Sequence, residues 1–251
     1  MIVNGCTPVL LVPGFMTDGD LWRDMADDLA AIGPIVYADL GDGDTIEAMA
    51  RHAASSCPSP CVLVGFSMGG YIAREMVRLV PDKVAALVLI ATSARADTPQ
   101  QTQRKANASR TVSASSYRGL STPAIKASLA SRHANDQPLI ARVQAMGLRL
   151  GYDEFIRQST LARPGDLDRL GDIHCPTLVI ATTEDQLRTL DEAKELRDGI
   201  PGSTLQVIEN SGHMVPLEQP GPLAASMTSW LRGIDIPDQR IIQSIKHTVT
   251  M

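Results

Sequence analysis

Short, uninterrupted apolar runs recur along the chain and alternate with longer segments whose apolar residues follow helical spacing. Val9–Val12 and Val84–Ile90 are such runs, and neither contains a polar position. An apolar run without polar alternation is typical of a strand that is buried on both faces, as in a parallel sheet. The expected strands are 8–12, 35–39, 61–64, 84–90, 175–181 and 204–208.

The segments between these strands predict helices. Between Ala73 and Val80, for example, apolar residues lie at i, i+3, i+4 and i+7, and a proline then ends the pattern. Asp20 is expected to cap a helix over 21–32. Strands that alternate with helices indicate βαβ units, and therefore an α/β fold with a mostly parallel central sheet flanked by helices. The other expected helices are 46–55, 190–198 and 222–231.

The pattern changes between about Thr92 and Leu170. Strand-like runs are absent there, and helical segments with polar faces are interrupted by prolines. We interpret residues 94–170 as a helical lid inserted into an α/β core. The core would consist of 1–93 and 171–235, with 236–251 as a C-terminal tail. Helices that simply flank the sheet are the alternative for the same segment.

The composition narrows the class of protein. The 251 residues suit one large domain or one domain with an inserted subdomain, and 44% are hydrophobic. A net charge of −5 with no long basic run argues against nucleic acid and anionic membranes as partners. The N-terminus lacks the features of a signal peptide, and no apolar stretch is long enough to span a bilayer, so a cytoplasmic protein is expected. The four cysteines show no zinc-site spacing, and neither a metal nor another cofactor is expected.

The sequence Gly65-Phe66-Ser67-Met68-Gly69 connects an expected strand to an expected helix. A sharp strand-to-helix turn strains its central residue and pushes the Ser67 hydroxyl out above the sheet. Gly65 and Gly69 flank the serine because a side chain would collide where strand and helix cross closely. A glycine-rich turn without chemistry is the alternative, but the strand before the turn and the helix after it favour a nucleophile elbow.

A serine hydroxyl needs a base to take its proton, normally a histidine whose other nitrogen bonds an acid. Of the five histidines, only His213 lies in a loop directly after an expected strand, with Gly212 beside it for a close approach. The others lie in expected helices, in the tail or just before a strand. Catalytic residues of open parallel sheets gather at the carboxyl ends of strands, where Ser67 and His213 both lie. A surface histidine without a role is the alternative.

The acid is also expected in a loop after a strand. Asp185 follows the strand 175–181, and Glu184 is its immediate competitor. Adjacent loop residues point in different directions, so only one of the two carboxylates can face His213. Asp39, at the end of an earlier strand, is a weaker candidate. A helix cap or a solvated loop charge is the alternative role for Asp185.

Acyl transfer also requires N–H groups for the negative oxygen of the tetrahedral intermediate. We expect one of them to be the backbone N–H of Met68, the residue after the serine. The loop after the first strand, Pro13-Gly14-Phe15-Met16, should supply the other through the N–H of Phe15. An ordinary turn is the alternative for that loop.

With these residues assembled, the chain resembles the α/β-hydrolase superfamily. Its order Ser67, Asp185, His213 matches the superfamily's order of nucleophile, acid and histidine, which differs from the orders in the chymotrypsin and subtilisin folds. Residues 176–185 look like the superfamily's acid strand and loop, and residues 211–220 are similar to its histidine loop.

The resemblance covers nearly the whole chain and implies the α/β-hydrolase fold. It assigns the acid to Asp185 rather than Glu184. The chain departs from the family pattern at the oxyanion loop, where Pro13-Gly14 replaces the common His-Gly, and after the acid, where Gln186 replaces a frequent proline. Few residues precede the first strand, so the family's leading antiparallel hairpin is expected to be missing or reduced.

Together these residues predict a cofactor-free serine hydrolase that cleaves a small ester or related acyl substrate. Ser67 would attack the carbonyl, His213 would relay the proton and Asp185 would orient His213. A C–C bond hydrolase or lyase with the same triad, and a non-catalytic ligand receptor on the same fold, are the alternatives. The expected partner is a small molecule, and a homodimer remains open. Residues that would line an apolar pocket, with ordinary core as the alternative for each, are Met16, Trp22, Phe66, Met146 and Met214.

Overall fold

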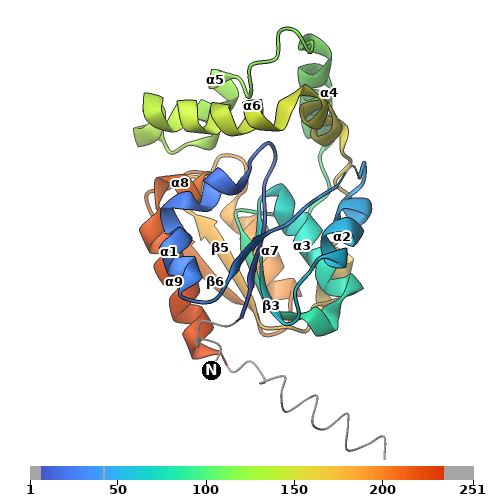
Figure 1. The fold of residues 1–251 in the computed structure, drawn as a ribbon, viewed down its shortest axis with the longest axis vertical. Coiled ribbons are helices and arrows are strands. Elements are labelled where there is room, and N and C mark those ends of the chain that lie inside the picture. The colour runs from blue at the N-terminus through green and yellow to red at the C-terminus, as the bar shows by residue number, and fades with distance from the viewer. Residues whose placement is uncertain (1–6, 42, 235–251) are drawn as a thin grey trace, which may run out of the picture.

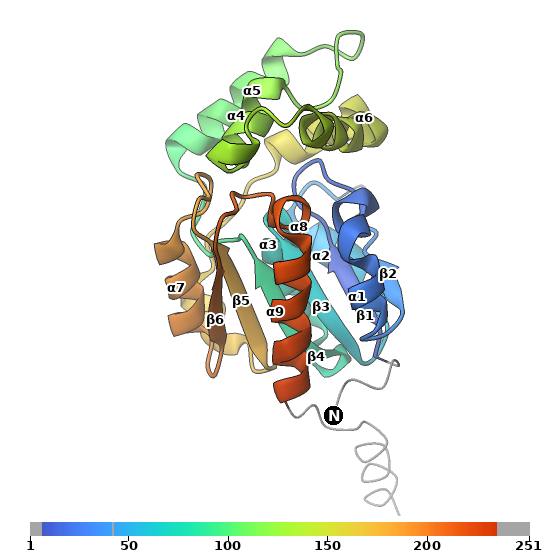
Figure 2. The same cartoon turned by 90° about the vertical axis from the view of Figure 1, so that its left-hand side faces the viewer.

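The described part of the chain is residues 7–41 and 43–234 of a computed structural model. It forms a sheet with helices on both faces and a helical layer over one end of the strands (Figures 1 and 2). The predicted tail 236–251 and the residues 1–6, which carry the signal-peptide prediction, lie outside the described residues. The strands are β1 (Val9–Val12), β2 (Ile35–Tyr37), β3 (Cys61–Phe66), β4 (Val84–Ile90), β5 (Thr177–Thr182) and β6 (Thr204–Ile208).

All the described strands run parallel, in the order β2-β1-β3-β4-β5-β6. The predicted α/β fold with a mostly parallel sheet is therefore confirmed, and no antiparallel strand precedes β1 among the described residues. The chain passes from β1 outward to β2 and then returns to the other side of β1 with β3. The strand order thus reverses between β1 and β3, which is where open parallel sheets bind ligands.

Side chains of the strands alternate between the two faces of the sheet, and each face has its own buried cluster. Leu11 and Val64 point to one face, whereas Leu10 and Leu63 point to the other. Elements on the first face are η1 (Gly19–Met25), α1 (Ala26–Ala30), α8 (Val215–Glu218) and α9 (Pro220–Gly233). Elements on the second face are α2 (Ile46–Ser55), α3 (Met68–Leu79) and α7 (Leu190–Gly199), and the short η2 (Pro81–Lys83) precedes β4.

The helices between β4 and β5 form a layer over the carboxyl ends of the strands (Figures 1 and 2). Arg149 in this layer donates from Nε to Asp18 Oδ2 at 2.7 Å, which ties the layer to η1. Whether the layer acts as a lid stays a prediction. Its elements are α4 (Pro99–Thr111), α5 (Thr122–Ser128), η3 (Ser131–His133) and α6 (Gln137–Thr160, bent at Gly151), followed by η4 (Leu167–Asp172) against α7.

The helix expected over 21–32 begins earlier and is divided into two elements. Residues 19–25 form the 3-10 helix η1, and only Ala26–Ala30 is α-helical. Asp18 caps η1, because its side chain accepts a hydrogen bond from the N–H of Asp20 at 3.0 Å. The expected cap at Asp20 is therefore wrong. Both positions carry aspartate, so the local sequence alone does not separate them.

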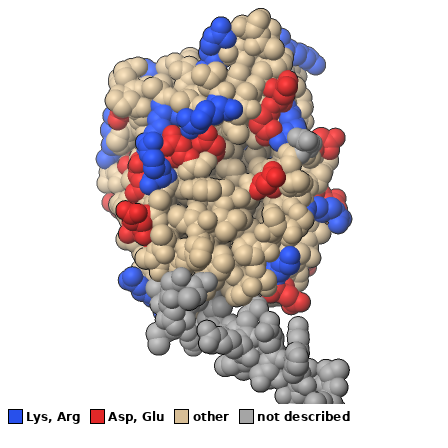
Figure 3. Space-filling model, viewed as in Figure 1, with Lys and Arg blue, Asp and Glu red and all other residues tan. Residues whose placement is uncertain are grey.

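Surface charge, helix length and potential metal ligands are relevant to the partners and cofactors expected from the sequence. Figure 3 shows lysine and arginine beside aspartate and glutamate where the helical layer meets the core. None of the helices in residues 7–41 and 43–234 is long and apolar enough to cross a bilayer. Within the same residues, no group of three or more His, Cys, Asp or Glu side chains is arranged to hold a metal ion.

Candidate active site

Ser67 lies at the sharp turn between β3 and α3. Its φ of 51° and ψ of −112° are uncommon for a residue with a side chain. The Ser67 N–H donates to the carbonyl of Ile90 at 2.9 Å, and the Thr92 hydroxyl donates to the Ser67 carbonyl at 2.6 Å. A Cβ atom at Gly65 would lie 2.6 Å from the carbonyl oxygen of Gly69, so strand and helix cross too closely for a side chain there.

Ser67, His213 and Asp185 form a continuous hydrogen-bonded chain. Ser67 Oγ lies 2.8 Å from His213 Nε2, and His213 Nδ1 lies 2.8 Å from Asp185 Oδ2. The side chains of His213 and Asp185 are 7% and 2% exposed, so water has little access to their contact. The second oxygen of Asp185, Oδ1, accepts from the N–H groups of Leu187 at 2.7 Å and Arg188 at 2.9 Å. Because both carboxylate oxygens have fixed partners, Asp185 holds the imidazole in one orientation.

The other candidate acids face different partners. Glu184 accepts a hydrogen bond from Arg132 at 2.6 Å. Asp39 Oδ2 lies 3.1 Å from Nε2 of His52, a residue of α2. Of the three carboxylates considered from the sequence, the structure brings only that of Asp185 to His213.

The loop that carries His213 packs directly against the helical layer. The His213 N–H donates to the carbonyl of Ser128, the last residue of α5, at 2.8 Å. A Cβ atom at Gly212 would lie 2.4 Å from the amide nitrogen of Ala130, so only glycine allows this approach. The helical layer therefore positions the backbone of the histidine.

The two expected oxyanion donors lie in the two segments nearest the serine, the start of α3 and the loop after β1. Met68 is the first residue of α3, and its N–H is among the groups that a helix N-terminus leaves without an intrahelical partner. Phe15 follows Gly14, at which a Cβ atom would lie 3.3 Å from the Cβ of Ser67. The Gly14 N–H donates to the hydroxyl of Thr17 at 2.9 Å, which closes the loop into a turn beside the serine.

The order of strands, the turn at Ser67 and the positions of Asp185 and His213 agree with a comparison against known families. A model described as "Alpha/beta hydrolase family" matches residues 9–226. The chain belongs to the alpha/beta hydrolase family.

Individual relatives of this α/β-hydrolase are distant. It is 24% identical over 269 residues to the biotin biosynthesis bifunctional protein BioHC of Cellvibrio japonicus, covering 94% of this chain but only 50%, about half, of that protein's length. It is 27% identical over 243 residues to a pimeloyl-[acyl-carrier protein] methyl ester esterase of Neisseria meningitidis serogroup C, covering 90% of this chain and 94% of the relative. A solved thermophilic esterase from Thermogutta terrifontis matches with a TM-score of 0.78 and 27% identity over 91% of this chain and 90% of the other. The resemblance drawn from the sequence is confirmed, and the chain is an α/β-hydrolase enzyme.

The five residues predicted to line an apolar pocket of this α/β-hydrolase are all buried, and none is more than 4% exposed. The Phe66 ring lies 5.3 Å from the imidazole of the site, and Trp22 packs edge-on against Phe66 with ring centroids 6.3 Å apart. Met146 and Met214 belong to the cluster on the first face of the sheet, and Met16 packs beneath the helical layer. Their part in binding a substrate stays a prediction.

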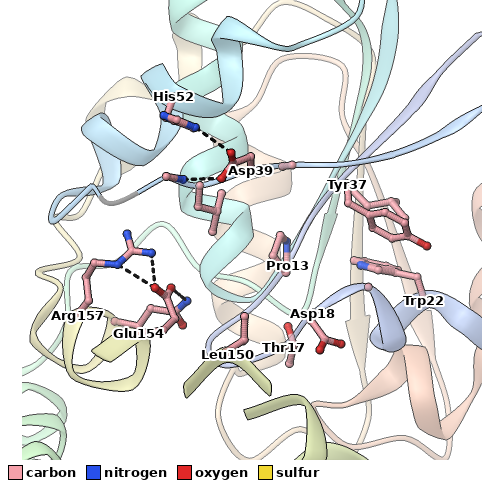
Figure 4. A pocket seen from close by; sticks show the side chains of 16 residues that line it. Pro13, Thr17, Asp18, Trp22, Tyr37, Asp39, His52, Leu150, Glu154 and Arg157 are labelled. Atoms are coloured by element: carbon pink, nitrogen blue, oxygen red, sulfur yellow. Dashed lines mark hydrogen bonds and ion pairs between the residues drawn. The ribbon is translucent and has the colours of Figure 1, made fainter. Parts of the chain in front are cut away.

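A cavity of about 770 Å³ lies beside the loop 13–17 (Figure 4). Of the five predicted pocket residues only Trp22 lines it, and neither Ser67 nor His213 does. The cavity is therefore a neighbouring hollow and not the space in front of the serine hydroxyl. The acidic and basic side chains in its wall are those of Asp18, Asp39, His52, Glu154 and Arg157.

Glu218 in α8 supports the site but was not singled out by its sequence. It is 8% exposed, and its two carboxylate oxygens accept from the N–H groups of Met214 at 3.1 Å and Ala130 at 2.7 Å. One side chain thus ties the histidine loop to the helical layer. Glu218 lies in the segment 211–220, which resembles the superfamily's histidine loop, but its contact with Ala130 joins residues 88 positions apart in the chain.

Glu218→Gln is expected to change how stability depends on pH. Burial raises the pKa of Glu218 above its usual 4.5, although the N–H groups of Ala130 and Met214 oppose the shift. The folded protein therefore keeps this proton to higher pH than the unfolded chain, and stability falls as pH rises from about 4.5 through the folded pKa. Glutamine keeps the shape but does not titrate. Urea unfolding across this range should show the wild type losing stability relative to the variant as pH rises. A free energy of unfolding of the wild type that stays constant or increases relative to that of the variant would contradict the assignment.

Proposed function

We propose that this α/β-hydrolase is a serine hydrolase that cleaves a small ester or related acyl substrate. Ser67 is the nucleophile, His213 the general base and Asp185 the acid that orients it. The observation that carries the proposal is the chain of contacts from Ser67 Oγ through His213 to Asp185, with both distances at 2.8 Å. A serine within hydrogen-bond reach of a base that is itself oriented by a third group is the arrangement that activates a hydroxyl.

The proton path follows from the partners of the imidazole. Asp185 accepts the hydrogen on Nδ1, which leaves the lone pair of Nε2 facing the Ser67 hydroxyl. As Oγ bonds to the substrate carbonyl carbon, its proton passes to Nε2 of His213. The imidazolium then gives this proton to the leaving alcohol as the carbon–oxygen bond breaks. Water repeats the two steps on the acyl-enzyme and releases the acid.

The N–H groups of Phe15 and Met68 are proposed to bind the carbonyl oxygen as it becomes negative. Donors that are already aligned stabilise the transition state because they need no rearrangement when the charge develops. The N-terminus of α3, where Met68 lies, adds a partial positive charge to the same point.

Support for an ester as the substrate class comes from the relatives. One of them is named for the hydrolysis of a methyl ester, and a second protein that covers nearly the whole chain is an esterase. We propose a carboxylic ester for this chain, bound between the core and the helical insertion 94–170, which acts as its lid.

A fluorophosphonate probe tests the proposal, because phosphonylation requires an activated serine. We expect the probe to label the folded protein on the peptide that contains Ser67, with loss of p-nitrophenyl acetate hydrolysis in the same proportion. Protein denatured in urea should not be labelled, since His213 and Asp185 are then no longer at the serine. A folded protein that stays unlabelled, or a label on another serine, would overturn the proposal.

An acid quench during p-nitrophenyl acetate turnover separates acyl transfer from chemistry in which the serine only moves protons. We expect an acetyl group on the Ser67 peptide by mass spectrometry. Turnover without any covalent adduct would point to the hydrolase or lyase chemistry that does not pass through an acyl-enzyme.

A further inference from the structure

A buried hydrogen bond ties the loop 13–17 to helix α6. The N–H of Met16 donates to Oε1 of Gln158 at 2.8 Å, and the two residues are 0% and 3% exposed. Met16 has a φ of 52°, a left-handed conformation that is strained for a residue with a side chain. Such a conformation persists only where its surroundings hold it.

The amide of Gln158 is itself fixed by neighbours. Its Nε2 donates to Glu154 Oε1, and Arg157 Nε donates to the other oxygen of Glu154 at 2.9 Å. Arg157 Nη1 also donates to the carbonyl of Gly43 at 2.6 Å. Figure 4 shows Glu154 and Arg157 facing each other in the wall of the cavity. Because Nε2 is committed to Glu154, Oε1 is the end of the Gln158 amide that faces Met16.

Apolar contacts from the helical layer hold the same loop. The rings of Phe15 and Phe155 have centroids 6.2 Å apart, and the Met16 side chain lies in a buried cluster with Tyr117 and Phe155. The Tyr117 hydroxyl donates to the carbonyl of Gly147 at 2.9 Å, which fixes this cluster to α6. The side chains of Phe15 and Met16, on either side of this peptide bond, therefore both pack against residues of the helical layer.

We propose that Gln158 is a positioning residue for the oxyanion hole. Its Oε1 fixes the Phe15–Met16 peptide, and through it the direction of the preceding N–H, that of Phe15. This inference rests on the proposed serine hydrolase function and deepens it. It makes the helical insertion a part of the catalytic geometry, because α6 must be docked before the Phe15 donor is aligned.

Gln158→Met removes the acceptor while keeping the length and burial of the side chain. The Met16 N–H then lacks its partner, and the loop can relax from its strained conformation. A displaced donor stabilises the developing oxyanion less but changes the binding of the uncharged carbonyl little. We expect kcat to fall about 10- to 100-fold while KM changes by less than about threefold.

Two further variants and a second readout make the test specific. Gln144→Met is the matched control, since Gln144 also lies on α6 but its Cγ lies beside Gly119, where an added Cβ atom would come within 3.1 Å of it. The exchanged pair Glu154→Gln with Gln158→Glu keeps an acceptor oxygen for Met16 and a hydrogen bond from amide to carboxylate between positions 154 and 158. This double variant should retain most of kcat per active site titrated with a fluorophosphonate. Phenylboronic acid forms a tetrahedral adduct with an activated serine, so its inhibition constant reports on the oxyanion hole. We expect that constant to rise in Q158M by the same factor as kcat/KM falls.

The outcomes separate this inference from the proposed function. A Q158M protein that melts earlier but keeps wild-type kcat and boronate affinity would overturn the inference alone. So would a Q144M protein with the same loss of kcat. A wild-type protein that neither turns over the ester nor binds the boronate would overturn the serine hydrolase function, and the inference with it.

Discussion

Replacing Asp185 with asparagine is expected to lower kcat for ester hydrolysis about 10⁴-fold without unfolding the protein. Oδ1 of Asp185 accepts from the N–H groups of Leu187 and Arg188 at 2.7 and 2.9 Å. The amide oxygen of asparagine would keep these two bonds, which turns its NH₂ group toward Nδ1 of His213. Nδ1 must then accept a hydrogen bond, so the ring hydrogen moves to Nε2. The lone pair that should take the Ser67 proton is lost.

Steady-state kinetics with p-nitrophenyl acetate and the rate of fluorophosphonate labelling measure this effect. Glu184→Gln is the matched control, because this neighbouring carboxylate pairs with Arg132 instead, and its kcat should stay within about threefold of wild type. Circular dichroism and the melting temperature show whether each variant is folded. A folded D185N protein with more than about a tenth of wild-type kcat would remove Asp185 from the role of orienting acid.

Replacing Arg74 with methionine is expected to destabilise the protein by about 3 kcal/mol. The Arg74 side chain is fully buried and donates to both oxygens of Asp166, at 2.9 and 2.8 Å, and to the carbonyl of Ser93 at 2.8 Å. Methionine fills the space but leaves the buried carboxylate without its main cation. Arg78 still donates to Asp166 at 2.8 Å, so we expect the lower end of the range of about 3–5 kcal/mol for a broken buried pair.

The loss in R74M should depend on pH. Burial raises the pKa of Asp166, but the hydrogen bonds and charges of Arg74 and Arg78 outweigh it and hold that pKa below its usual 3.8. The stabilisation is therefore complete above the unfolded pKa and is lost as pH falls through the folded pKa. Urea unfolding should show a smaller difference between R74M and wild type at about pH 3 than at neutral pH.

The control for R74M is Arg51→Met, which breaks an exposed pair with Glu47 on α2. Such surface pairs contribute less than about 1 kcal/mol, so little change in the free energy of unfolding is expected. An equal loss in both variants, or a loss in R74M that does not vary with pH, would contradict the assignment of a buried ion pair.

Most of the core could be predicted because its signals are local. Strands buried on both faces of a parallel sheet are mostly apolar, as β1, β3, β4 and β5 are. Each expected strand overlaps one of β1 to β6, although the outer strands β2 and β6 are partly exposed. The turn at Ser67 is equally local, since the flanking glycines, strand and helix lie within a few residues of it. Asp185 and His213 could be proposed as its partners because the carboxyl ends of parallel strands meet at one edge of the sheet.

Contacts between distant segments could not be predicted in this way. Gln158 resembles any other polar residue of α6, and the residue to which it is bonded, Met16, lies 142 positions away. The bond from Glu218 to the Ala130 N–H spans 88 positions and is equally invisible in a local pattern. Helical periodicity records which side of a helix is buried, but not which partner covers that side. The contacts by which residues 94–170 dock on the core therefore cannot be predicted from local patterns.

Residues 91–176 separate β4 from β5 along the chain, although Leu89 and Val179 are partners in the sheet. During refolding β1 to β4 can assemble from nearby segments, whereas β5 joins only after a long loop has closed. Until then β4, which is buried along nearly its whole length in the native state, presents an apolar edge. An unpaired apolar edge can bond to the same edge of another chain. The insertion thus sets a kinetic competition between completing the sheet and aggregating, and we expect the yield of refolding to fall as protein concentration rises.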